Sequence, residues 1–143
     1  MAKNILGVIT GVAVWVIAAT VAGLMMRASW PAYASVASAM TFTLPMMIAR
    51  LSIGAVATIA MGMVTAAVAP SAVARVTPGV LMLVAFIPEH VTLWEKFPVW
   101  YHLTFLISLV PLTYAGSHIV DRLRQSSLGS TVAAVPARSL TRS

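Results

Sequence analysis

The chain alternates long apolar runs with short polar breaks. Four runs have few or no charged residues, and they cover residues 4–26, 44–69, 76–94 and 99–120. A helix needs about 20 predominantly apolar residues to cross the hydrocarbon core of a bilayer. The pattern therefore predicts four transmembrane helices at these positions, joined by short connections.

Two of these runs contain residues that interrupt the apolar pattern. The third is too short between Val76 and Phe86, and it reaches spanning length only if Pro88, Glu89 and His90 lie at membrane depth. The fourth contains Pro111, which removes one backbone donor and is expected to kink the helix. We expect both runs to span in spite of these interruptions.

The beginning of the chain allows two interpretations. Lys3 followed by an uncharged run is also the pattern of a cleaved signal peptide, but this run is longer than the 7–15 residues of a typical signal core. We therefore expect a retained first span. After it, Arg27 to about Met40 is expected to be a loop with a segment lying at the interface, because Trp30 precedes a proline and is biased away from helix.

The end of the chain differs from the rest in composition. Residues 122–143 are polar, rich in Ser and Arg, and show no strong periodicity. Such a segment cannot bury enough apolar surface to offset the entropy of ordering. We expect a transmembrane domain at residues 1–121 and a basic, disordered cytoplasmic tail at 122–143.

Composition supports the membrane interpretation. Of the 143 residues, 60% are hydrophobic and 8% are charged, with a mean hydropathy of +0.96. Soluble domains carry about 25% charged residues, so this chain could not solvate a soluble surface. The predicted fold class is an all-α integral membrane bundle of four helices. The absence of cysteine excludes disulfides and thiolate chemistry.

The distribution of charge predicts the orientation. If both termini lie on one side, that side holds six of the nine basic residues, namely Lys3, Arg75, Arg122, Arg124, Arg138 and Arg142. The positive-inside rule then places both termini in the cytoplasm. The basic residues are scattered at the ends of apolar runs, so we expect no nucleic-acid partner. The layout resembles small four-helix, multi-pass proteins of the bacterial inner (plasma) membrane in architecture only.

Aromatic residues gather on the predicted external side. Trp and Tyr rings favour headgroup depth because one edge is apolar and another can hydrogen-bond. We interpret these as interfacial anchors, with a ligand-stacking box as the alternative: Trp30, Tyr33, Trp94, Trp100 and Tyr101.

The most specific polar constellation comprises Arg50, Glu89, His90 and, on the fourth run, His102. Ionised groups near hydrocarbon are costly unless they are paired or hydrated. We expect Arg50 and Glu89 to form an ion pair, or these side chains to line a polar path. The histidines and Glu95 match no compact metal motif, so we expect no metal and no cofactor.

Small residues recur every four positions on two of the runs. Gly7 and Gly11 form one pair, and Gly54, Thr58 and Gly62 continue along one face of the second predicted helix. Small faces allow close approach of helices in lipid. We interpret both stripes as helix-packing surfaces, within the bundle or between copies of it.

No nucleotide loop, nucleophile–base pair or paired catalytic carboxylates occur in the sequence. We therefore predict a non-enzymatic accessory or scaffold subunit, or a homo-oligomer, whose partners are the lipid bilayer and another membrane protein or itself. The alternative is a small ion- or proton-coupled transporter or channel that uses Arg50, Glu89 and His90. A membrane enzyme with an external site at Glu89, His90 and His102 lacks a recognisable nucleophile.

Overall fold

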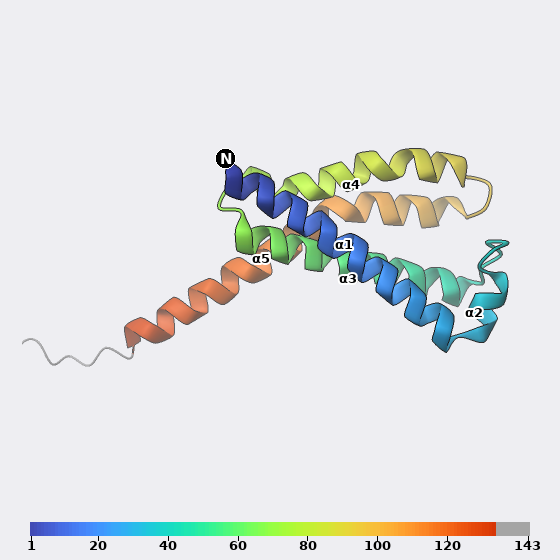
Figure 1. The fold of residues 1–143 in the computed structure, drawn as a ribbon, viewed down its shortest axis with the longest axis horizontal. Helices are drawn as coiled ribbons and strands as arrows, with labels where there is room; N and C mark the ends of the chain where they lie inside the picture. The colour runs from blue at the N-terminus through green and yellow to red at the C-terminus, as the bar shows by residue number, and fades with distance from the viewer. Residues whose placement is uncertain (134–143) are drawn as a thin grey trace, which may run out of the picture.

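The computed structural model describes residues 1–133, with side chains through residue 127, and this part of the chain is helical without strands. The helices are α1 (Ala2–Ser29), α2 (Pro31–Val36), α3 (Leu44–Val68), α4 (Ala72–Thr92) and α5 (Val99–Ala133) (Figure 1). Helices α1, α3, α4 and α5 are long and apolar enough to cross a membrane. The prediction of an all-α chain with four such helices is confirmed.

The four long helices run back and forth between two ends of the bundle (Figure 1). One end holds the N-terminus and the turn between α3 and α4, and we call it the N-terminal end. The other holds α2 and the turn between α4 and α5, and we call it the α2 end. Helix α3 is central, because it packs most extensively against both α5 and α1.

Small residues let α3 and α5 approach closely. A Cβ atom added at Gly62 would collide with the backbone carbonyl of Thr113, and one added at Gly116 would collide with the carbonyl of Ile59. Because these two glycines have no Cβ atom, the backbones of the two helices can approach each other closely. Ser117 adds a hydrogen bond across this interface, donating to the Gly62 carbonyl at 3.2 Å.

Glycines also allow α1 and α3 to approach each other closely. A Cβ at Gly7 would lie 2.8 Å from the Cβ of Ala69, and one at Gly11 would collide with the hydroxyl of Thr65. Thr58 contributes a polar link, because its hydroxyl accepts a hydrogen bond from the indole of Trp15 at 3.0 Å. The structure thus places both small-residue stripes between helices of this chain.

A charged cluster closes the N-terminal end. Arg75 of α4 donates to both carboxylate oxygens of Asp121 of α5 at 2.7 Å, and its Nε donates to the carbonyl of Ala69. Arg124 donates to the carbonyl of Ala67 at 3.0 Å. The last carbonyls of α3, which have no partner within their own helix, are therefore capped by arginines from two other helices.

Two stretches are more helical than the sequence predicted. Helix α1 continues past Arg27 to Ser29 and breaks only at Trp30, after which α2 forms a short helix where a loop was expected. Helix α5 continues to Ala133, so the prediction of a disordered tail is wrong for residues 122–133, while residues 134–143 lie outside the described part. Serine hydroxyls in this extension bond to carbonyls three or four residues earlier, so these polar side chains find partners within the helix.

Candidate functional site

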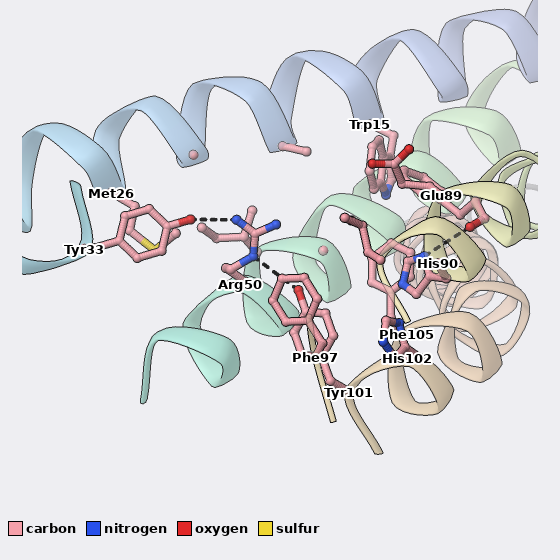
Figure 2. A pocket seen from close by; sticks show the side chains of 16 residues that line it. Trp15, Met26, Tyr33, Arg50, Glu89, His90, Phe97, Tyr101, His102 and Phe105 are labelled. Carbon is pink, nitrogen blue, oxygen red and sulfur yellow. Dashed lines mark hydrogen bonds between the residues drawn. The ribbon is translucent and has the colours of Figure 1, made fainter. Parts of the chain in front are cut away.

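A cavity of about 260 Å³ lies at the α2 end, between all five helices (Figure 2). We call it the α2-end cavity. Its lining comprises Trp15, Ala19, Gly23 and Met26 of α1, Tyr33 of α2, Arg50, Ile53 and Gly54 of α3, Phe86, Glu89, His90 and Leu93, Phe97, and Tyr101, His102 and Phe105 of α5. The cavity therefore gathers the four polar residues that the sequence singled out.

Arg50 is held in the cavity by two tyrosines. It lies about two turns inside α3, where its Nη1 donates to the hydroxyl of Tyr33 at 2.7 Å and its Nε donates to the hydroxyl of Tyr101 at 3.2 Å. Its guanidinium carbon also lies 4.8 Å from the centre of the Phe42 ring, a favourable cation–π distance. These contacts fix the orientation of the cation without neutralising its charge.

The two tyrosines were expected to anchor the chain at the membrane interface. Instead, Tyr33 and Tyr101 are 2% and 7% exposed and point inward toward Arg50 (Figure 2). A buried tyrosine hydroxyl needs a hydrogen-bond partner, and Arg50 supplies one for each. Their assignment as surface anchors is therefore wrong, whereas Trp94 and Trp100 are exposed and Trp30 is half-buried beside Tyr33.

Arg50 and Glu89 line the same cavity but do not form the predicted ion pair. Within residues 1–127, the salt bridge that the structure contains joins Arg75 to Asp121. Figure 2 shows the guanidinium and the carboxylate on different sides of the cavity. The physical reason is that the two tyrosine hydroxyls hold the guanidinium, while Glu89 projects from the last turn of α4. That turn lies across the cavity from Arg50.

His90 presents an acceptor to the cavity. Its Nδ1 lies 3.1 Å from the carbonyl oxygen of Phe86, one turn earlier in α4. Because a carbonyl can only accept, Nδ1 carries the hydrogen, and the neutral ring then has a free lone pair on Nε2. His90 thus lies beside Glu89 as a second hydrogen-bond acceptor on the α4 wall.

His102 is buried without any hydrogen bond. It is 1% exposed, and neither ring nitrogen has a partner. Trp94 stacks on it with ring centres 4.8 Å apart, and the ring of His90 meets it edge-on at 5.2 Å. An unsatisfied buried polar group costs about 1–3 kcal/mol. The α2 end therefore retains an energetic cost that its packing does not remove.

Aromatic rings form the apolar wall of the cavity. The Trp15 and Phe86 rings are 5.2 Å apart, Phe86 meets Phe105 at 5.1 Å, and Phe105 stacks on His90 at 4.9 Å. These distances are in the favourable range for aromatic pairs. The wall is thus a connected set of rings contributed by α1, α4 and α5.

Sequence reasoning missed most of this wall. Trp15 and Phe105 lie within long apolar runs, where nothing distinguishes a cavity-facing ring from a lipid-facing one. Gly23 was missed too, and a Cβ added there would meet no atom within 4 Å. One available signal was the spacing of Trp15, Ala19 and Gly23, which places one large and two small residues on the same face of α1.

Among the described side chains, no three His, Asp or Glu residues come together in a cluster that could hold a metal ion. One cation, one carboxylate and two imidazoles line this aromatic-walled space, and such groups can take part in non-covalent recognition. No family model, curated protein or solved structure matches the chain.

Proposed function

We propose that the protein is a multi-pass membrane protein that binds a small organic solute in the α2-end cavity, as a small transporter does. The observation that carries this proposal is Arg50, a fixed cation in a hydrophobic helix with no carboxylate partner among the described residues. Charged residues within transmembrane helices usually pair or mark a substrate path. An acidic group on the solute is the partner that Arg50 lacks.

The proposed orientation places this cavity on the external face of the bacterial inner (plasma) membrane. With both termini cytoplasmic, six of the nine basic residues are inside, as the positive-inside rule requires. A reporter fused at the C-terminus should read cytoplasmic, and a tag at Glu95 should be accessible from outside. A C-terminus found outside would reverse the direction from which the solute enters.

A binding measurement tests the proposal directly. We expect 3-phenylpropionate, an acid with one aromatic ring, to raise the thermal unfolding midpoint of the protein in nanodiscs, because a ligand that binds the folded state stabilises it. Arg50→Gln should abolish the shift. Arg50→Lys should weaken it, because lysine lacks the fork that engages two hydroxyls and a carboxylate together. Arg27→Gln, at an exposed cation outside the cavity, is the matched control.

A shift that survives Arg50→Gln and disappears in no other cavity variant would contradict a site at Arg50. Retention of the shift in Arg27→Gln together with its loss in Arg50→Gln would support the site. Both variants remove one positive charge, so a general electrostatic effect would lower both shifts equally.

An accessory or homo-oligomeric role is the second candidate, and α1 favours it. Helix α1 is the least buried of the four long helices, and large apolar side chains such as Ile17 face outward. The chain has no native cysteine, so Ile17→Cys can be cross-linked in membranes, with Ile107→Cys on the exposed face of α5 as control. A cross-linked dimer from Ile17→Cys alone would favour this role, whereas monomer from both would argue against self-association through α1.

A further inference from the structure

We infer, on the basis of the proposed function, that the solute is a zwitterion with a small apolar body. Its anionic group would bind Arg50, and its cationic group would bind Glu89. The inference starts from the observation that two opposite charges line one cavity without pairing to each other. If the ligand were a simple acid, the carboxylate of Glu89 in the cavity wall would repel it.

Glu89 is an exposed residue that lines the cavity, and its position on α4 disfavours an unpaired carboxylate. Glu89 lies in the last turn of α4, where the negative end of the helix dipole repels negative charge. No lysine or arginine among residues 1–127 forms a salt bridge with it. A bound cation would relieve both costs, whereas a purely anionic ligand would increase them.

The neighbours of Glu89 on the cavity wall fit a cation as well. The rings of Trp15 and Phe86 lie in the same cavity, and aromatic faces attract ammonium groups. His90 adds the free lone pair on its Nε2, which can accept a hydrogen bond from an ammonium group. This side of the cavity therefore offers a carboxylate, an imidazole acceptor and aromatic rings together.

Arg50 retains the capacity to bind an acid. A guanidinium group has five N–H donors, and two hydrogen bonds, to Tyr33 and Tyr101, engage its Nε and Nη1. The remaining N–H groups can donate to the oxygens of a carboxylate or a phosphate in the paired geometry that arginine favours. Arg50 and Glu89 are thus complementary to the acidic and the ammonium group of a zwitterion.

The size of the cavity limits the ligand. At about 260 Å³, it lies just below the range of roughly 300–1,000 Å³ that is usual for ligand pockets. A single amino acid or betaine satisfies this limit, and so does the headgroup of a zwitterionic phospholipid. The shared chemistry is one acidic and one ammonium group around a short apolar spacer.

A matched set of three solutes tests the inference. L-phenylalanine, 3-phenylpropionate and 2-phenylethylamine share one aromatic body, and they carry both charges, only the negative charge and only the positive charge. We expect phenylalanine to bind the protein in phosphatidylglycerol nanodiscs about tenfold more tightly than either of the others, since tenfold corresponds to one modest additional interaction. Isothermal titration gives each dissociation constant.

Two variants test which residue binds which charged group of the solute. Glu89→Gln should weaken binding of phenylalanine and improve binding of 3-phenylpropionate, because it removes a repelling carboxylate. Arg50→Gln should weaken phenylalanine and 3-phenylpropionate but leave 2-phenylethylamine unchanged. Glu95→Gln, which removes an exposed carboxylate outside the cavity lining, should change none of the three.

A second arm of the experiment tests whether the zwitterion is a lipid headgroup. If the zwitterion is a lipid headgroup, none of the three solutes should bind. Exchange of phosphatidylglycerol for phosphatidylethanolamine should then raise the unfolding midpoint of the unmodified protein but not of Glu89→Gln. Tighter binding of 3-phenylpropionate than of phenylalanine, with no effect of Glu89→Gln, would overturn the zwitterion while leaving the proposed binding at Arg50 intact. Absence of any effect in both arms would overturn both proposals.

Discussion

The two ends of the bundle use the same residue types in opposite ways. At the N-terminal end, Arg75 and Asp121 form a salt bridge through two contacts of 2.7 Å. At the α2 end, Arg50 and Glu89 line one cavity without pairing, and His102 is buried without a hydrogen bond. At the N-terminal end the arginine and the aspartate therefore satisfy each other, whereas the α2 end retains unpaired groups around an open space. Such unpaired groups reduce stability and are the features that a ligand can complete.

The largest difference between the ends should appear when their glycines are replaced. Gly62→Leu places a side chain against the backbone of Thr113, and we expect a loss near the upper end of the roughly 1–3 kcal/mol that overpacking costs. Gly23→Leu extends into open space and should not reduce stability, because leucine is also the better helix former. Thermal unfolding in detergent measures both.

Leu51→Ile controls for a general sensitivity of α3, and it should change the midpoint little. Gly23→Leu should also reduce the binding of 3-phenylpropionate by filling the cavity. Equal tolerance of Gly62→Leu and Gly23→Leu would show that the contact between α3 and α5 is looser than described.

Acidic residues at the two ends should respond differently to neutralisation. Asp121→Asn removes a carboxylate that accepts two bonds from Arg75. We expect a loss of about 1–2 kcal/mol, because hydrogen bonds to charged groups contribute roughly 1.5–3 kcal/mol and solvent screens this partly exposed pair. Glu89→Gln removes a charge that has no basic partner in the described residues and should leave stability unchanged or slightly higher. A larger loss from Glu89→Gln than from Asp121→Asn would contradict the contrast.

The smallest effect concerns His102. His102→Phe replaces an unsatisfied imidazole with an apolar ring of similar shape, and we expect stability to rise by up to about 1 kcal/mol, since the cost of the buried nitrogens is removed. Thr113→Val is the control, because it removes a buried hydroxyl whose hydrogen bond to Leu109 is already made at 2.7 Å. A stability loss in His102→Phe as large as in Thr113→Val would indicate that His102 has a partner.

The sequence predicted the helices well and the site only in part. Apolar runs of sufficient length identify spanning helices because the bilayer imposes a length on them, and Arg50 and Glu89 stand out because charge is rare here. What the sequence does not contain is rotational position. Tyr33 and Tyr101 have the composition of interfacial anchors, yet they point inward. Only the packing of α2 and α5 around α3 decides that the two hydroxyls point toward Arg50.

The extension of α5 illustrates a different limit. Residues 122–133 lack apolar periodicity, and a low hydrophobicity predicts disorder. In the structure they continue an existing helix, so the costly nucleation step has already been made by the preceding apolar turns. A prediction from local composition therefore misses a polar segment that continues a helix begun by the preceding residues.

The most direct test of the account is a double-mutant cycle of Arg50→Gln and Glu89→Gln, measured as unfolding midpoints with and without saturating L-phenylalanine. Without the solute we expect the two changes to be additive, because the charges do not contact each other. With the solute, either single change should remove most of the stabilisation and the double change should remove little more. This result would show that the two charges act together only through a bound ligand. Strong coupling without the solute, unchanged by its addition, would mean that Arg50 and Glu89 pair directly and would contradict the account.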